Sequence, residues 1–375
     1  MKIVLLSSYL NHHQTALAQA LWEKTSGNFT FIATREMGPE RKQLGYAPPE
    51  GAEYFLEAFR NEELARRRIE EADVVLAGSA PEKLVRPRIR AGKLLLRYSE
   101  RPLKRGIEPV KFVPRLIRWH WRNPAGKPIY MLCGSAYTAG DYAKFGLFRN
   151  RTYKWGYFPE TKGYEDLDAL FLEKEPTQIL WCGRFLDWKR PDAGIRLAKR
   201  LKDAGYSFRL KLIGCGEMEG ILRDMAENFG LNNCVHFPGP MPPEAVRAQM
   251  EKAGICLVTS GRREGWGAVV NEAMNSGCAV VAGHEIGAVP YLIRDGENGL
   301  VYKSEDDLFE KVRDLLERPG KQRKLGAAAY RTIAGHWNAS VAAERLIMLS
   351  ERILAGEISP DLFESGPCSR AEGIT

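Results

Sequence analysis

Short apolar segments alternate with helical ones along the chain, and this alternation is what most limits its fold. In the first half, the apolar segments that read as strands are 3–6, 29–33, 74–77, 94–98 and 129–133. In the second half, they are 178–184, 210–214, 235–237, 255–258 and 279–282. Two parallel strands need a crossover, which is usually a helix, so this order predicts parallel sheets covered by helices on both faces.

The length and the polar interruption predict two domains. The chain has 375 residues, enough for two domains that each bury a core. The apolar pattern lapses at 159–176, which is a candidate linker. We therefore predict an N-terminal domain at 1–165 and a second domain at 175–340. Residues 341–375 are predicted to form a terminal helix followed by a loose tail that is rich in Gly, Pro and Ser.

The composition excludes some classes of protein. No stretch approaches the roughly 20 apolar residues of a membrane span, and the chain opens directly into a strand, without the pattern of a signal peptide. The seven cysteines are scattered and odd in number, with no pairs at metal-ligand spacing. These features predict a cytoplasmic protein without a metal site.

The net charge of +8 is concentrated in one block of the first domain. Residues 83–127 carry fourteen basic residues against two acidic ones. If 114–122 is helical, Arg115, Arg118 and Arg122 share a face, with Trp119 and Trp121 beside it. Three interpretations remain open: the block binds an anionic membrane surface, it lines a pocket for an anionic ligand, or it is a solvated basic face. Nucleic acid is not expected, because no recognised binding motif accompanies the charge.

The richest segment of the chain runs from Glu264 to Glu272. The strand at 255–258 leads into a turn with Gly265 and Gly267, and a helical stretch follows. Free backbone amides at the start of a helix bind phosphate or hydroxyl groups, and glycines let a ligand approach the backbone. Two carboxylates that accept hydrogen bonds from vicinal hydroxyls, with amides between them, predict a nucleotide-sugar site. The alternative is a helix entered through a flexible turn, with solvated carboxylates.

This segment resembles the Glu-x7-Glu motif of the family 4 retaining glycosyltransferases, also called group 1 glycosyltransferases. The resemblance implies the GT-B fold: two Rossmann-like parallel-sheet domains that face each other across a cleft, with a C-terminal helix that crosses back to the first. It also implies that Glu264 holds sugar hydroxyls and Glu272 the ribose. The remaining contacts, to the sugar and the distal phosphate, are implied for the backbone of Gly265, Trp266, Gly267 and Ala268.

A second motif follows the first strand of the second domain. Gly183-Arg184 and Lys189 resemble the family element in which an Arg and a Lys hold the donor diphosphate. Two fixed cations stabilise the negative charge that develops on the leaving diphosphate. The resemblance therefore implies catalysis by Arg184, Lys189 and Glu264 without a metal ion or other cofactor. Lys189 as an ordinary surface residue is the alternative.

Two further elements resemble parts of the family's nucleotide pocket. A strand ends at Gly214-Cys215-Gly216, and another is followed by Gly239-Pro240-Met241. The third glycine of a dinucleotide-binding fingerprint is absent. By the resemblance, Gly214, Gly216, Gly239 and Met241 line the nucleotide site.

Loops of the first domain carry the candidate acceptor residues. Asn11, His12 and His13 follow the first strand, and Glu100 follows the strand at 94–98. Loops at the carboxyl ends of parallel strands form the ligand crevice, so we expect these four residues there. Capping of the next helix by Asn11 or His12 is the alternative.

Together these features predict a hexosyltransferase that acts with retention. It would move a sugar from a nucleoside diphosphate, with a UDP-sugar favoured, to a hydroxyl acceptor in polysaccharide or glycolipid synthesis. The acceptor would be a saccharide or a lipid-linked molecule. Two alternatives stay open: a nucleotide-sugar epimerase of the same fold, and an inactive subunit that binds nucleotide sugar.

Overall fold

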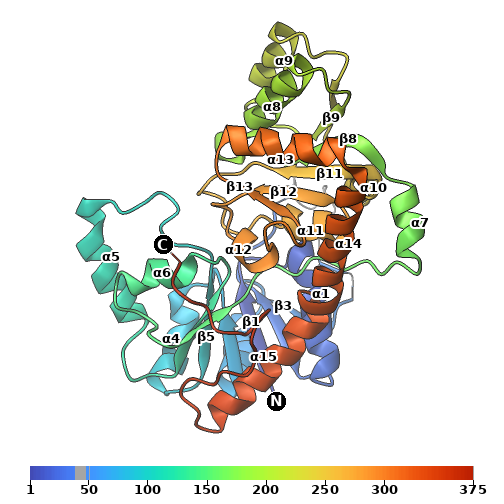
Figure 1. Cartoon of the computed structure of the whole chain (residues 1–375). Helices are drawn as coiled ribbons and strands as arrows, with labels where there is room; N and C mark the ends of the chain where they lie inside the picture. The colour runs from blue at the N-terminus through green and yellow to red at the C-terminus, as the bar shows by residue number, and fades with distance from the viewer. Residues whose placement is uncertain (39–47, 50, 375) are drawn as a thin grey trace. The chain divides into compact units, whose positions relative to one another are not determined.

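The chain forms two compact units (Figure 1). The computed structural model describes residues 1–38, 48–49 and 51–374. Unit 1 contains Met1–Glu160 and Trp337–Thr375, and unit 2 contains Thr161–His336. Because unit 1 is built from both ends of the chain, unit 2 is an insertion between them.

Unit 1 is a seven-stranded parallel sheet in the order β3-β2-β1-β4-β5-β6-β7. Its strands are β1 (Ile3–Ser7), β2 (Phe29–Ala33), β3 (Phe55–Glu57), β4 (Val74–Ala77), β5 (Leu95–Ser99), β6 (Ile129–Cys133) and β7 (Thr152–Lys154). Its helices are α1 (His12–Lys24), α3 (Glu62–Glu71), α4 (Glu82–Arg90), α5 (Pro109–Arg122), α6 (Thr138–Ala143) and α15 (Ala339–Leu354). The interior strand β1 pairs with β2 through Ile3 and Phe29, and with β4 through Ile3 and Val74. Its apolar residues are buried on both faces, as expected of a covered parallel sheet.

Unit 2 repeats this plan with a six-stranded parallel sheet in the order β10-β9-β8-β11-β12-β13. Its strands are β8 (Glu175–Cys182), β9 (Arg209–Ile213), β10 (Val235–Gly239), β11 (Ala253–Val258), β12 (Ala279–Gly283) and β13 (Leu300–Tyr302). Its helices are α7 (Leu167–Leu172), the 3-10 turn η1 (Asp187–Lys189), α8 (Pro191–Asp203), α9 (Glu219–Asn228), α10 (Pro243–Lys252), α11 (Val269–Asn275), α12 (Val289–Leu292), α13 (Glu305–Glu317) and α14 (Pro319–His336). The two predicted parallel sheets are therefore both present.

The terminal helix returns to the first unit, as the resemblance implied. Helix α15 packs against α1, and Lys24 of α1 forms an ion pair with Glu344 of α15 at 3.3 Å. The buried stripe of α15 includes Leu346, Leu349 and Ile353. Unit 1 therefore depends on a helix that is more than 300 residues away from α1 in sequence.

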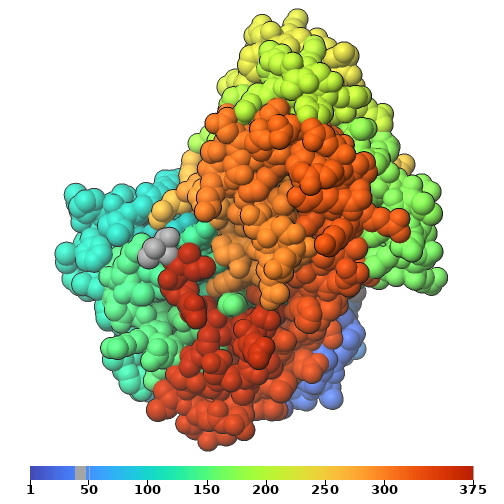
Figure 2. All heavy atoms as spheres, in the orientation of Figure 1, coloured from blue at the N-terminus to red at the C-terminus, as the bar shows by residue number. Residues whose placement is uncertain are grey.

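The tail was predicted to be loose, and this prediction was wrong. Residues after α15 run along β7, where Lys154 and Ser369 form a backbone hydrogen bond of 2.8 Å and Tyr153 pairs with Arg370 in antiparallel fashion. Cys368 and Ala371 are buried in this contact. In the space-filling view the red C-terminal segment lies against the green residues of unit 1 (Figure 2). The tail covers a sheet edge that would otherwise expose unpaired backbone groups.

One local prediction also changes. The predicted linker at 159–176 contains α7 and the start of β8, and the boundary between the units falls at 160–161. Helix α11 begins at Val269, so Glu272 lies in its first turn. Among the described residues, no helix has the length and apolar character needed to span a membrane.

Candidate functional site

In unit 2, the predicted motifs meet where the strand order reverses. Strand β8 lies between β9 and β11, so the connections that leave β8 and β11 diverge to opposite sides of the sheet. In open parallel sheets, ligands bind outside the carboxyl ends of the strands at such a switch point. The loop after β8 carries Arg184 and Lys189, and the loop after β11 carries Glu264. The topology therefore brings together residues that are about 80 positions apart in the sequence.

Backbone and side-chain contacts connect these two loops. The Thr259 hydroxyl accepts a hydrogen bond from the Trp181 indole at 2.7 Å and donates to the Lys189 carbonyl at 2.8 Å. The Gly261 amide donates to the Trp188 carbonyl at 2.8 Å. Thr259 is buried, so these bonds are shielded from water and hold Lys189 in a defined place.

Lys189 and Glu264 are in direct contact. The Lys189 ammonium forms an ion pair with one Glu264 carboxylate oxygen, Oε2, and the Ser260 hydroxyl donates to the same oxygen at 3.1 Å. Both side chains are largely buried. A cation and a carboxylate thus point at one position, where the cation can hold phosphate and the carboxylate can accept from sugar hydroxyls.

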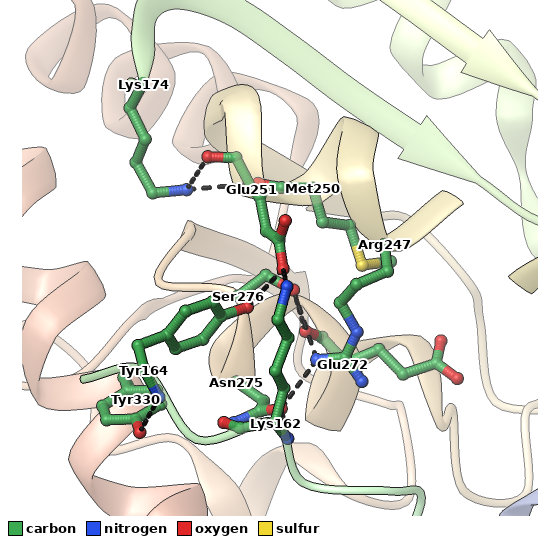
Figure 3. Close-up of polar contacts among 10 residues, drawn as sticks. All are labelled: Lys162, Tyr164, Lys174, Arg247, Met250, Glu251, Glu272, Asn275, Ser276 and Tyr330. Atoms are coloured by element: carbon green, nitrogen blue, oxygen red, sulfur yellow. Dashed lines mark hydrogen bonds and ion pairs between the residues drawn. The ribbon is translucent and has the colours of Figure 1, made fainter. Parts of the chain in front are cut away.

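Glu272 belongs to the same region but has a different environment. Burial raises the pKa of the Glu272 carboxyl to about 7, while the charges of Arg247 and Lys189 act in the opposite direction. Arg247 comes from α10 and donates to the Asn275 side chain at 2.6 Å (Figure 3). The pKa of Glu272 is therefore set by burial against the charges of two cations, Arg247 and Lys189.

A polar network fixes the helix that carries Glu272. The Lys162 amide donates to Asn275 of α11 at 2.8 Å, and the Lys162 ammonium pairs with Glu251 of α10 at 2.7 Å (Figure 3). The Tyr164 hydroxyl donates to the same Glu251 oxygen at 2.6 Å. The segment that enters unit 2 thus ties α10 to α11 and sets the direction of Glu272.

The atoms around each glycine of the site explain why a larger residue does not fit there. Gly267 has φ +90°, and a Cβ there would lie 2.8 Å from Ile286. A Cβ on Gly214 would lie 1.9 Å from the Gly183 carbonyl oxygen, and one on Gly216 would lie 2.6 Å from the Phe185 carbonyl oxygen. Gly214 and Gly216 in the loop after β9, and Gly267 in the loop after β11, are therefore required for the packing of these loops, whatever their part in binding a ligand.

The other predicted residues of unit 2 lie around this centre. The Gly214 amide donates to the Gly239 carbonyl at 3.1 Å, which puts the ends of β9 and β10 side by side, and Met241 follows. Trp266 is fully buried, and its indole donates to Asn271 at 2.8 Å. Its side chain is therefore part of the core, between Gly265 and Gly267, and Ala268 is the residue before α11. Arg184 is exposed and, within the described part of the chain, has no ion pair with an acidic residue.

Unit 1 has a separate polar cavity of about 480 Å³ at its own switch point. The loops after β1, β4 and β5 line it, and so does the end of α5. Asn11 and Glu100 belong to the lining, as do Tyr98, Tyr157 and Lys104. The Tyr157 hydroxyl donates to Glu100 at 2.6 Å, and Lys104 forms an ion pair with the other Glu100 oxygen. Hydroxyl groups and charges of both signs suit a polar ligand that carries its own hydroxyls.

The histidines of the first loop are placed differently from Asn11. Asn11 caps α1, because its side chain accepts from the His13 amide at 3.0 Å. His12 and His13 belong to the first turn of α1 and are not among the residues that line the cavity. Burial lowers the pKa of His12 to about 4, so this imidazole is neutral at physiological pH. Asn11 thus both caps α1 and lines the cavity.

The basic block forms the predicted helix, but one of its two tryptophans is buried and the other is exposed. Trp119 packs in the core against Phe145, with ring centroids 4.6 Å apart, so it cannot reach an interface as expected. Trp121 is exposed beneath the Arg86 guanidinium at 4.0 Å. Arg115 pairs with Glu108 at 3.2 Å, and Arg122 pairs with Glu82 at 3.5 Å. Two of the three arginines that the sequence singled out are therefore partly neutralised.

Several residues of both sites were not found from the sequence. Arg247 and Asn275 in unit 2, and Tyr157 in unit 1, reach their sites through packing between distant segments, whereas Lys104 lies four residues after Glu100. Ser260 had a signal, because it lies four residues before Glu264 and two residues after the end of β11.

The two Rossmann-like units and the returning helix define the fold of the GT-B glycosyltransferases. HepE of Anabaena, solved in complex with UDP and glucose, matches 94% of this chain and 100% of its own, with a TM-score of 0.66 and 15% identity. At that identity the likeness concerns the fold. The sequence model for glycosyl transferases group 1 matches residues 165–332, nearly all of unit 2. Unit 2 is therefore similar in sequence to the group 1 glycosyltransferases.

Two relatives match part of the chain. The D-inositol 3-phosphate glycosyltransferase of Corynebacterium aurimucosum is 30% identical over 159 residues, which are 40% of this chain and 37% of the relative. WcaL of Salmonella typhimurium, which is named for colanic acid biosynthesis, is 29% identical over 136 residues, 35% of this chain and 33% of that protein. The matches thus span well under two thirds of either relative.

Proposed function

We propose that this protein is a retaining hexosyltransferase that takes a sugar from a nucleoside diphosphate, with a UDP-sugar favoured. The observation that carries the proposal is the convergence of Lys189 and Glu264 on one point at the switch of unit 2, with Glu272 in the first turn of α11. The family of residues 165–332 and the UDP complex of HepE support the choice of donor.

The arrangement suggests how the sugar–phosphate bond is broken. Arg184 and Lys189 would hold the diphosphate and stabilise the negative charge that grows on it as it leaves. Glu264 would accept from the sugar hydroxyls and orient the ring, and Glu272 would accept from the ribose. The bond to the acceptor oxygen would form on the face that the phosphate leaves, and the departing phosphate oxygen would take the acceptor proton. No protein base, metal ion or other cofactor is needed in this scheme.

The cavity of unit 1 is proposed as the acceptor site. Its lining of Tyr98, Tyr157, Glu100 and Lys104 offers donors and acceptors for the hydroxyls of a saccharide or of a lipid-linked sugar. The name of WcaL favours an acceptor in cell-surface polysaccharide synthesis, and the inositol phosphate relatives favour a small or glycolipid acceptor. We place the reaction in the cytoplasm, where nucleotide sugars are made.

The decisive experiment compares Lys189→Ala with a matched lysine variant, Lys199→Ala, on the exposed side of α8, where Lys199 pairs with Asp203. With UDP-sugars as donors, UDP release by Lys189→Ala should fall by about 10²-fold or more, since removing one fixed group that stabilises the transition state costs about 2.7–4 kcal/mol. Lys199→Ala should keep wild-type turnover. Both variants should melt near the wild-type temperature.

Three further outcomes separate the alternatives. Release of UDP that stops in EDTA and returns with Mg²⁺ contradicts the metal-free scheme. Conversion of the UDP-sugar to its epimer without UDP release indicates an epimerase. A stabilising effect of UDP on thermal unfolding without any turnover indicates an inactive binding subunit. Retention is checked by the anomer of the sugar that is first released, measured by NMR.

A further inference from the structure

Helix α5 exposes a row of apolar side chains on unit 1, and Trp121 at the end of this row lies under the Arg86 guanidinium at 4.0 Å. Val110, Val113, Ile117 and Trp121 follow one another at spacings of three, four and four residues, and each is 53–89% exposed. Such spacing places them on one stripe, because a helix turns about 100° per residue. Ile107, just before the helix, is also exposed. We call these five residues the apolar row.

The apolar row is distinct from the buried face of the same helix. Phe112, Leu116 and Trp119 pack on the core of unit 1. The helix therefore has two apolar faces, and only one of them is needed to attach it to the fold. Large apolar residues gathered on one exposed stripe mark a surface that contacts another partner.

Cations border the apolar row on one flank. Residues 104–122 contain six basic residues and one acidic residue, Glu108. Lys111, Arg115, Arg118 and Arg122 fall on the helix between the apolar row and the buried face. Among the described residues, Arg105 and Arg118 are exposed and have no acidic partner within 4 Å. This pattern of an apolar stripe beside a basic one is typical of helices that lie in the interface of an anionic membrane.

We propose that α5 docks unit 1 on an anionic lipid surface, with the apolar row in the boundary between headgroups and acyl chains and Arg105 and Arg118 on the phosphates. A second copy of this chain fits the surface less well, because α5 packed on α5 would oppose two basic flanks. Trp119, Arg122 and Asn123 of the same segment line the cavity of unit 1, so the lipid surface would lie about one helix diameter, roughly 10–12 Å, from that cavity. The docking goes beyond the proposed transfer reaction and does not depend on it.

The test uses the full chain and co-sedimentation with vesicles of phosphatidylcholine, with and without phosphatidylglycerol. The test variant carries Val110→Ser, Val113→Ser and Ile117→Ser, which remove apolar area without touching the core. The matched control carries Leu172→Ser, Ile221→Ser and Ile358→Ser, at positions that are 57–79% exposed elsewhere on the chain. Partition of the test variant onto anionic vesicles should fall about tenfold or more, given the apolar area lost, and the control should bind like the wild type.

The contribution of charge to vesicle binding is tested by raising the salt concentration and by a double variant that carries Arg105→Gln and Arg118→Gln. Binding should weaken in both cases, because salt screens the attraction to lipid phosphates. Wild-type protein that stays in solution with phosphatidylglycerol vesicles overturns the proposal, and so does equal binding by the serine variant. A dimer in sedimentation velocity that the serine variant loses would identify a self-association surface instead. Donor turnover without vesicles should be the same in all of these variants, so a failure of the transfer reaction is seen separately from a failure of docking.

Discussion

At the scale of single residues, charge at this site depends on neighbours that are far away in sequence. Glu264 lies within reach of Lys189, 75 positions earlier, and of Ser260 in its own loop. Glu272 lies near Arg247, which α10 supplies. A motif written as two glutamates therefore contains two carboxylates with different chemical environments.

This difference predicts a pH-dependent stability for Glu272→Gln. The folded-state pKa of Glu272 is raised to about 7, above the ordinary value of a carboxyl. At pH 5 the carboxyl is largely protonated in the folded protein, which costs little. As the pH rises from about 4.5 to about 7, the unfolded chain gives up this proton while the folded protein keeps it, so the folded protein loses stability; above 7 the loss levels off. Glu272→Gln, which never ionises, should therefore raise the melting temperature more at pH 8 than at pH 5.

Thermal unfolding at the two pH values checks this prediction. Glu297→Gln, at an exposed position in the loop after α12, is the control and should shift the melting temperature equally at both. An equal shift for Glu272→Gln would mean that its carboxyl is not perturbed. The same variant should bind UDP more weakly, because an amide is a poorer acceptor than a carboxylate for the ribose hydroxyls.

At the scale of elements, the tail pairs with β7, the edge strand of the first sheet. Three contacts join it to β7: Lys154 to Ser369, Cys368 to Lys154 and Ala371 to Thr152, with hydrogen bonds of 2.8, 2.8 and 3.1 Å. The Thr152 hydroxyl also donates to the Ala371 carbonyl at 2.8 Å. A segment that is polar in composition is thus ordered by the backbone groups of an edge strand.

Ala371→Glu should therefore destabilise unit 1. Ala371 is 6% exposed and packs in the core of unit 1, so a glutamate there must bury a charge or detach the tail. Detachment loses several hydrogen bonds worth about 0.5–1.5 kcal/mol each. Urea unfolding should show a loss of a few kcal/mol in the free energy of unfolding. Glu372→Ala, at the exposed neighbouring position, should leave the midpoint in place; a similar loss there would argue against an ordered tail.

At the scale of the whole molecule, the two units differ in how they are encoded. Unit 2 is continuous, Thr161–His336, whereas unit 1 is discontinuous because α15 and the tail come from the end of the chain. The buried face of α1, with Leu17 and Leu21, is covered in part by α15. Separating the chain at the unit boundary thus affects the two units unequally.

We expect the fragment 161–336 to fold by itself and the fragment 1–160 not to do so. The first retains a whole sheet and its core, while the second exposes the face of α1 and the edge of β7. Circular dichroism and thermal unfolding of both fragments check this expectation. Fragment 161–336 should also gain stability with UDP, since Lys189, Glu264 and Glu272 all lie within it. A cooperative transition for 1–160 would contradict the assigned role of α15.

The sequence by itself determined the two parallel sheets and the alternation of strands and helices that builds them. These follow from local patterns: apolar runs of strand length, helical spacing, and glycines at the ends of strands. Strands β3, β7 and β13 escaped prediction, because each has three residues and a segment that short carries too little pattern. All three lie at sheet edges, where hydrogen bonds to the neighbouring strand hold the segment extended.

The tertiary structure decided which residues and segments of the chain contact one another. It alone places Arg247 near Glu272, Tyr157 on Glu100, the tail on β7 and α15 on α1. It also separates Trp119, which is buried, from Trp121, which is exposed, although they stand two residues apart on one helix. Local pattern records only that a residue is apolar or charged. Which neighbour it meets depends on how distant segments pack, and that packing is a property of the whole chain.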